Sequence, residues 1–206
     1  MLEARNLEAT RGEATLFSGL AFTLRPGALL RVRGANGSGK TSLLRVLCGL
    51  AQPSAGDVRW NGTDIRALRE EYWRHIAYVG HANALKDELT VAENLESAGA
   101  LAGIDAPPAR VQAAISQFGL AGRARLPVKL LSQGQRRRAA LARLTLSESV
   151  PLWILDEPFA ALDAGAVEQV QSVAQAQLAR GGMIVLTTHQ EARIDAPSAT
   201  DIDLDR

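Results

Sequence analysis

The chain has 206 residues, with 23 basic and 22 acidic side chains and a formal net charge of +1. This balance argues against a protein that binds nucleic acid through a basic surface, and the single cysteine, Cys48, excludes an internal disulfide. The length suits one domain over residues 1–206. The sequence contains no run of about 20 apolar residues, the length that would predict a membrane-spanning helix.

Strands and helices are expected to alternate along the chain. Apolar residues recur at every second position in parts of the first 33 residues, which predicts strands, and Asn61-Gly62 predicts a hairpin turn. In chain order we expect strands within residues 1–33, a helix from about 40 to 49, a strand at 57–60, a short buried strand at 76–80, helices at 90–122 (broken at Pro107-Pro108) and 132–146, a strand at 152–155, a helix at 164–180 and a strand at 183–187. This alternation indicates an α/β fold with buried parallel strands.

A glycine-rich loop follows the last strand of the first 33 residues. It fits G-x-x-x-x-G-K-S/T, the pattern of a phosphate-binding loop, whose glycines let backbone N–H groups point at phosphate oxygens. We expect Lys40 to reach the β- and γ-phosphates of a nucleotide and Thr41 to hold Mg²⁺. A glycine-rich turn without a ligand is the alternative. The predicted nucleotide-binding residues are Gly34, Ala35, Asn36, Gly37, Ser38, Gly39, Lys40, Thr41 and Ser42.

Two adjacent carboxylates follow the apolar run of residues 152–155. Acids at the end of a buried strand are costly unless a polar site uses them, and parallel sheets bind ligands at that end of their strands. We expect Asp156 to hold Mg²⁺, mostly through water, and Glu157 to polarise the water that attacks the γ-phosphate. An acidic turn that caps a helix is the alternative interpretation.

The helix expected at 132–146 begins with Leu131-Ser-Gln-Gly-Gln135. A capping box explains this start by itself, but a serine hydroxyl and a glycine N–H at a helix N-terminus can also bind an anion. Together with the loop and the acidic pair, in this order, the segment resembles the nucleotide-binding subunits of ABC transporters. Ala161-Leu-Asp163 resembles the D-loop of that family, and His189 resembles its switch histidine.

The resemblance implies a P-loop NTPase of the ABC type. Such a cassette has a RecA-like core, a small N-terminal antiparallel β subdomain and a helical signature subdomain, here at about residues 82–146. Lys40, Glu157 and His189 would be its catalytic residues.

The resemblance also implies a homodimer of cassettes paired head to tail. Each ATP would lie between the loop and acidic pair of one copy and the signature segment of the other. The signature residues concerned are Ser132, Gly134 and Gln135.

Two positions depart from the family's pattern. Arg11 stands where an aromatic residue usually stacks on adenine; a guanidinium plane can also stack on a base, so we keep Arg11 as a nucleotide contact. His81 stands where a glutamine is usual. We place His81 in the metal site, where it would bind water, but it could instead touch a membrane partner or be a loop histidine without a catalytic part.

The sequence around the motifs is most similar to the ATP-binding subunit of the haem exporter complex of cytochrome c biogenesis. That likeness implies ATP and Mg²⁺ as ligands, integral membrane subunits as partners (a haem exporter permease among them), no nucleic acid, and a peripheral position on the cytoplasmic face of a bacterial inner membrane. ATP hydrolysis would be linked to release of a haem-loaded periplasmic chaperone. A transporter for another substrate is the alternative.

Three further features are expected to be structural. Cys48 lies on the apolar side of the first helix and is expected to be packed. Residues 136–138, three arginines in a row, are expected to form a solvated helix face with an internal ion pair. Tyr72 and Trp73 are expected in a local core, with a partner-facing groove as the alternative.

Overall fold

The fold is described from a computed structural model, which covers residues 1–189 and 194–205. The strands are β1 (Leu2–Arg11), β2 (Ala14–Leu24), β3 (Ala28–Arg33), β4 (Ala55–Trp60), β5 (Thr63–Asp64), β6 (Ile76–Val79), β7 (Leu152–Leu155), β8 (Met183–Thr187) and β9 (Ser198–Asp203). The helices are α1 (Lys40–Leu47), α2 (Ile65–Leu68), α3 (Glu70–Trp73), α4 (Val91–Leu101), α5 (Pro108–Gln117), α6 (Gln133–Leu146) and α7 (Ala164–Ala179), with short 3₁₀ turns at Ala121–Arg123 and Val128–Leu130.

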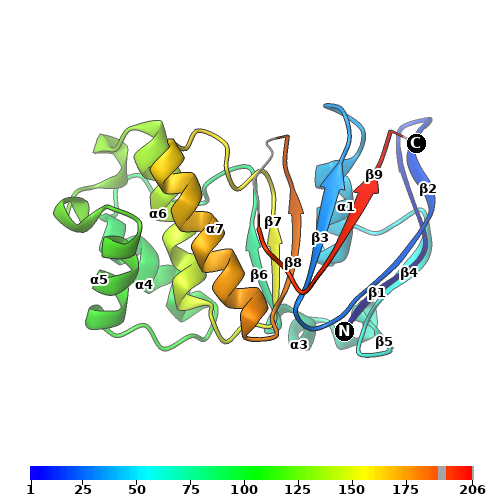
Figure 1. The fold of residues 1–206 in the computed structure, drawn as a ribbon, viewed down its shortest axis with the longest axis horizontal. Helices are drawn as coiled ribbons and strands as arrows, with labels where there is room; N and C mark the ends of the chain where they lie inside the picture. Colours follow the sequence, from blue (N-terminus) through cyan, green and yellow to red (C-terminus); the bar gives the residue numbers. More distant parts are fainter. Residues whose placement is uncertain (190–193, 206) are drawn as a thin grey trace.

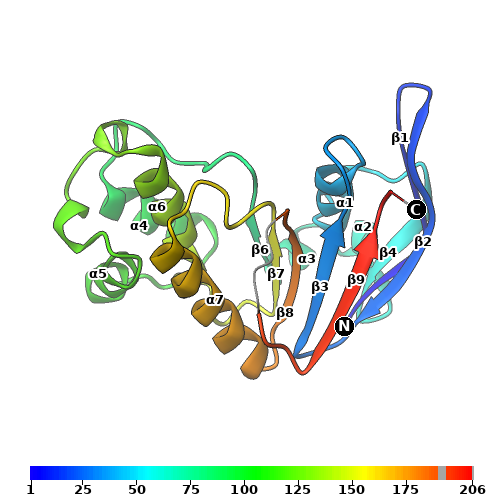
Figure 2. The same ribbon diagram turned by 45° about the horizontal axis from the view of Figure 1, so that its top comes forward.

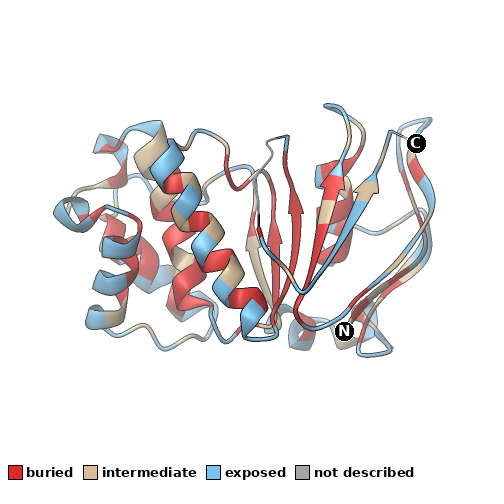
Figure 3. Cartoon of the chain, viewed as in Figure 1, coloured by how far each residue is buried: buried red, intermediate tan, exposed pale blue. Residues whose placement is uncertain are grey.

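A parallel sheet in the order β6-β7-β8-β3-β9 lies in the middle of the molecule (Figure 1). Its strands β7 and β8 are buried along their whole length (Figure 3). Parallel strands that are covered on both faces have continuous apolar sequences. The runs at 152–155 and 183–187 are apolar in this way. The predicted α/β fold with buried parallel strands is therefore confirmed.

Alternate residues of β7 face two apolar cores. Leu152 and Ile154 belong to a core shared with α1 and the antiparallel sheet. Trp153 and Leu155 belong to a core shared with α4, α5, α6 and α7. Because side chains alternate along a strand, one short strand anchors both halves of the molecule.

An antiparallel sheet in the order β2-β1-β4-β5 lies at one end of the molecule, and α4, α5 and α6 lie at the other (Figures 1 and 2). Asn61 and Gly62 join β4 to β5 with positive φ angles of 50° and 86°, as the predicted hairpin requires. The helical range proposed from the sequence, about 82–146, contains α4, α5 and α6. None of the helices in the described parts of the chain is long and apolar enough to cross a membrane.

The sequence patterns did not predict α2, α3 and β9. The expected burial of the strand at 76–80 is also wrong for most of β6, in which only Val79 is buried. The reason is its place in the sheet: β6 is an edge strand, bonded to β7 on one side only.

Candidate functional site

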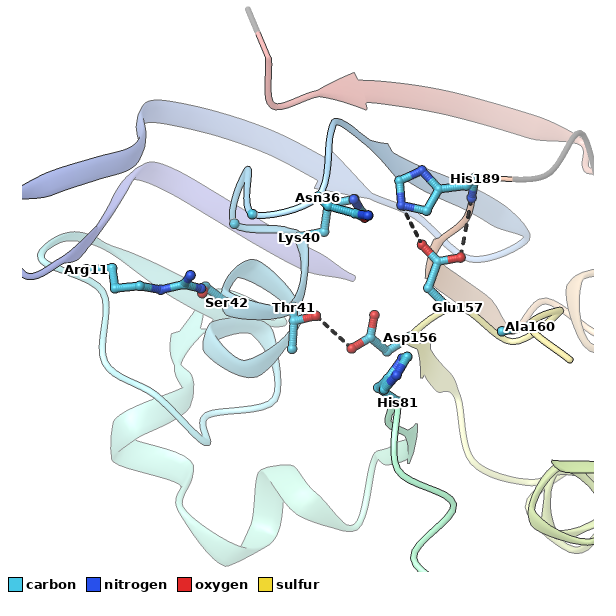
Figure 4. A pocket seen from close by; sticks show the side chains of 12 residues that line it. Arg11, Asn36, Lys40, Thr41, Ser42, His81, Asp156, Glu157, Ala160 and His189 are labelled. Carbon is cyan, nitrogen blue, oxygen red and sulfur yellow. Dashed lines mark hydrogen bonds and ion pairs between the residues drawn. The ribbon is translucent and has the colours of Figure 1, made fainter. Parts of the chain in front are cut away.

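The carboxyl ends of four parallel strands meet at one edge of the sheet, where a cavity of about 550 Å³ opens (Figure 4). The loop after β3 lines it, together with His81 after β6, Asp156 and Glu157 after β7, and His189 after β8. Arg11, at the end of β1, lines it from the antiparallel sheet. A parallel sheet brings such segments together because all its strands end on the same side.

The glycine-rich loop turns into α1 at Gly39, whose φ of +104° suits glycine but few other residues. A Cβ on Gly39 would also lie 3.0 Å from Leu16 Cβ, so a side chain here would require β2 to shift by a few tenths of an ångström. Of the predicted loop residues, Gly34, Ala35 and Ser38 do not line the cavity. Those that do are Asn36, Gly37, Gly39, Lys40, Thr41 and Ser42.

The Lys40 side chain folds back under this loop. Its Nζ donates hydrogen bonds to Gly34 O at 2.7 Å and to Ala35 O at 3.0 Å, and the residue is only 8% exposed. The hydroxyl of Ser38 is buried, and it has no hydrogen-bond partner in the described parts of the chain. The Lys40 ammonium can exchange its two backbone carbonyl partners for an anionic ligand, and the Ser38 hydroxyl of the same loop is a donor without an acceptor among the described residues.

Asp156 is 2% exposed, and hydroxyls from two other elements satisfy its carboxylate. Thr41 Oγ1 on α1 donates to Asp156 Oδ2 at 2.9 Å, and Thr187 Oγ1 on β8 donates to Oδ1 at 2.8 Å. The Thr187 hydroxyl also accepts the backbone N–H of Glu157 at 2.9 Å. Thr187 is not among the site residues predicted from the sequence; its signal is a polar residue at the end of a buried strand, and that strand lies next to β7.

Glu157 has a left-handed backbone with φ of +48°, a conformation that costs about 1 kcal/mol or more for a residue with a side chain. The backbone N–H of His189 donates to Glu157 Oε2 at 3.3 Å, and His189 Nε2 lies 3.5 Å from Oε1. Among the described residues, the buried Oε1 accepts no hydrogen bond. The Oε1 atom therefore has unused hydrogen-bonding capacity, and the His189 imidazole lies next to it.

The oxygens at the centre of the cavity fit a magnesium ion. Mg²⁺ prefers oxygen ligands and commonly takes one or two carboxylates, with phosphates and waters completing its shell. The Thr41 hydroxyl oxygen and the Asp156 carboxylate oxygen Oδ2 are two such oxygen ligands, and they lie 2.9 Å apart. The described residues include no group of three or more His, Cys, Asp or Glu that could hold a metal without further ligands. His81 and Asp156 line the same cavity (Figure 4).

The signature residues Ser132, Gly134 and Gln135 do not line this cavity. They begin α6, where Ser132 and Gln135 form the predicted capping box, with bonds of 3.0 and 3.3 Å. Ser132 is exposed, and a Cβ on Gly134 would lie 3.0 Å from Ala161 O. A ligand in the cavity of one chain would therefore not touch the signature segment of the same chain.

The expectation of a solvated arginine face is right for Arg136, which pairs with Asp87 at 2.9 Å, and wrong for Arg137, which is 4% exposed. Arg137 is buried because α6 packs against the ends of β6 and β7, and the side chain points to those ends.

Of the two aromatic residues that end α3, one lies in the core and the other at the surface. The expected core position is right for Tyr72, whose hydroxyl donates to Leu47 O, and wrong for Trp73, which is 52% exposed and donates its indole N–H to Cys48 O. The Cys48 thiol is packed as expected, and burial, with the nearby charge of Asp156, raises its pKa to about 12.

Known proteins resemble this chain over most of its length. Residues 17–160 match the family model described as ABC transporter. The cytochrome c biogenesis ATP-binding export protein CcmA of Nitrosomonas europaea is 54% identical over 191 residues, covering 93% of this chain and 89% of that protein. The protein of the same name from Dechloromonas aromatica is 50% identical, covering 99% of this chain and 100% of that protein.

A solved structure has the same fold. It is a dimeric ATP-binding cassette in a post-hydrolysis state bound to ADP and Pi, with a TM-score of 0.82 and 23% identity, covering 100% of this chain and 97% of that one. Since a family model matches more than half of the chain and relatives at least 50% identical span nearly all of it, the chain belongs to the ABC transporter family.

Proposed function

We propose that this chain is the ATP-hydrolysing subunit of a membrane export complex in cytochrome c biogenesis. The observation that carries the proposal is the meeting of Lys40, Thr41, Asp156, Glu157 and His189 around one cavity. The relatives named as cytochrome c biogenesis ATP-binding export proteins support the choice of complex.

The loop would bind the phosphates of ATP. Its backbone N–H groups and the N-terminus of α1 would face the phosphate oxygens. Lys40 would exchange its bonds to Gly34 O and Ala35 O for bonds to the β- and γ-phosphates. Arg11 lines the same cavity and would stack its guanidinium plane on the adenine.

Thr41 and Asp156 would hold Mg²⁺, and His81 would contact it through water. When bound, Mg²⁺ supplies positive charge that neutralises the charge on the β- and γ-phosphates. Asp156 already has its carboxylate fixed by the hydroxyls of Thr41 and Thr187, so the side chain needs little rearrangement to serve as a ligand.

Glu157 would orient the attacking water and take its proton through its carboxylate, which lines the cavity. The water oxygen would form a bond to the γ-phosphorus as the bond to the β-phosphate oxygen breaks, and ADP would leave with that electron pair. His189 holds Glu157 by two contacts, at 3.3 and 3.5 Å, and would hold the carboxylate toward the γ-phosphate.

A second copy would complete each site with Ser132, Gly134 and Gln135. The exposed, capped start of α6 offers a hydroxyl and backbone N–H groups, which suit the γ-phosphate of a partner's nucleotide. The dimeric state of the cassette with the same fold supports this pairing. Integral membrane subunits, including a haem exporter permease, would hold the dimer on the cytoplasmic face of the inner membrane.

Replacing the Glu157 carboxylate tests the proposal that the chain hydrolyses ATP. Glu157→Gln keeps the size of the side chain and removes its basicity, so ATP should remain bound, the dimer should persist and turnover should fall by at least about 100-fold. Glu148→Gln, in an exposed position, is the matched control and should turn over ATP like the unmodified chain. Unchanged hydrolysis in Glu157→Gln would refute the assignment.

Isolation of the chain from membranes tests the assignment to an export complex of cytochrome c biogenesis. We expect it to copurify with haem-handling integral membrane subunits. Recovery of a sugar or amino-acid permease in their place would contradict the assignment to cytochrome c biogenesis.

A further inference from the structure

A buried guanidinium on the signature helix joins two of the segments that line the cavity. Arg137 Nη2 donates to Asp156 O at 2.9 Å and to Glu157 O at 2.7 Å. Its Nη1 donates to Gly80 O at 3.0 Å and to Asn83 Oδ1 at 3.2 Å. One side chain of α6 thus holds both the end of β7 and the loop after β6.

These acceptors bracket the residues that face the ligand cavity. Gly80 and Asn83 lie on either side of His81, and the two carbonyls belong to the residues whose carboxylates line the cavity. Arg137 itself does not line the cavity. It therefore acts on a reaction there through these neighbours and not by contact with the ligand.

Glu157 needs such support, because its left-handed backbone persists only where its surroundings fix it. Thr187 Oγ1 accepts its N–H, and Arg137 donates to its carbonyl, so both of its peptide groups are held from outside β7. The guanidinium is suited to this task since its planar fork reaches acceptors on two sides, which a single ammonium cannot do. Burial lowers the pKa of Arg137, and the charges of Asp156 and Glu157 partly counter this.

We propose that Arg137 is a positioning residue that couples the signature helix to the catalytic carboxylate of its own chain. It holds Glu157 and the His81 loop in one arrangement. Because the signature segment on the same helix serves the partner's nucleotide in the proposed dimer, a shift of α6 is transmitted through this guanidinium to Glu157. This inference rests on the proposed function.

The test uses the full chain with Arg137→Met, which keeps the bulk of the stem and removes the donors, and Arg137→Lys, which keeps the charge but not the fork. We expect Arg137→Met to lower kcat for ATP about 10- to 100-fold, the effect of a small misplacement of a reacting group. KM for ATP should change less than about threefold, since the phosphate loop is untouched. Arg137→Lys should restore part of kcat.

Arg143→Met is the matched control. Arg143 is on the same helix, and burial lowers its pKa to about 10. It donates to Tyr78 O at 2.9 Å, before the His81 loop, and within the described parts of the chain it makes no hydrogen bond to Asp156 or Glu157. Its loss should lower stability and leave kcat within about threefold of the unmodified chain.

Amide hydrogen exchange gives a second readout that needs no activity. In Arg137→Met, exchange should rise in residues 79–84 and 156–160 and stay unchanged in α7, whereas general destabilisation would raise it throughout. An unchanged kcat, a loss of ATP affinity equal to the loss of kcat, an equal loss of kcat in Arg143→Met, or uniform exchange would each overturn the proposal. If the unmodified chain shows no turnover that Glu157→Gln removes, the proposed function fails, and the exchange pattern alone decides whether Arg137 positions these segments.

Discussion

At the scale of single residues, the site depends on hydrogen bonds that join side-chain oxygens of different elements. The Asp156 carboxylate is held by hydroxyls from α1 and from β8, and one of these hydroxyls also fixes the Glu157 backbone. A buried carboxylate in such a network is oriented before any ligand binds, and each missing donor leaves a buried acceptor unsatisfied. Thr187 is thus as integral to the site as the residues of the sequence motifs.

Thr187→Val tests this network, because valine keeps the shape of threonine and removes the hydroxyl. Asp156 Oδ1 and the Glu157 N–H then lose their partner, and we expect a decrease of about 1–3 kcal/mol in the free energy of unfolding, measured by urea titration. We also expect kcat to fall at least about tenfold. Thr187→Ser keeps the hydroxyl and should recover most of the turnover; equal activity in the valine and serine variants would contradict the prediction.

The residues that lie where the sequence patterns placed them belong to short local motifs. The loop, the acidic pair and the capping box each occupy a short segment, and strand-to-loop connections in a parallel sheet bring such segments to one edge. Thr187 and Arg137 were missed because their roles arise from contacts with residues distant in the chain. The sequence of three consecutive arginines does not indicate which side chain will point into the protein.

At the scale of elements, β9 is the clearest structure that the sequence patterns missed. The strand Ser198–Asp203 is mostly exposed and polar, so neither alternation nor an apolar run marks it. The hydrogen-bonded pairing with β3 forms this strand, although its amino-acid composition does not favour one. Just beyond it, Asp205 Oδ2 accepts the N–H of Ala35 at 2.7 Å, so the end of the described chain supports the phosphate loop.

The contact between the start of α6 and the turn after β7 gives a second prediction. A Cβ on Gly134 would lie 3.0 Å from Ala161 O, and Ala161 is held at a φ of +61°. Gly134→Ala should displace these segments by a few tenths of an ångström. ATP binding to the chain's own loop should stay unchanged, while ATP-dependent dimerisation and turnover should fall several-fold.

Equilibrium binding of a fluorescent ATP analogue and size-exclusion chromatography with ATP separate these two effects. Gly122→Ala is the matched control, because a Cβ there meets no atom within 4 Å and should leave both measurements unchanged. Loss of nucleotide binding by the Gly134 variant would show that the contact supports the chain's own site.

At the scale of the whole molecule, the two halves of the proposed site lie in different parts of one chain. The cavity lies at the carboxyl edge of the parallel sheet, whereas Ser132, Gly134 and Gln135 lie outside its lining. A head-to-tail pair joins each cavity to the other chain's α6, so two copies would complete two sites at once.

Mixing two inactive variants tests this arrangement. Lys40→Met disables a chain's own phosphate loop, and Ser132→Arg disables the signature segment that it offers to its partner. In a mixed dimer, one site combines the intact loop of the Ser132→Arg chain with the intact signature of the Lys40→Met chain. Random pairing makes about half of the dimers mixed, with one intact site of two, so an equimolar mixture should recover up to about a quarter of the unmodified turnover. If each chain used its own signature segment, both defects would stay within their own chains, and the mixture would remain as inactive as its components.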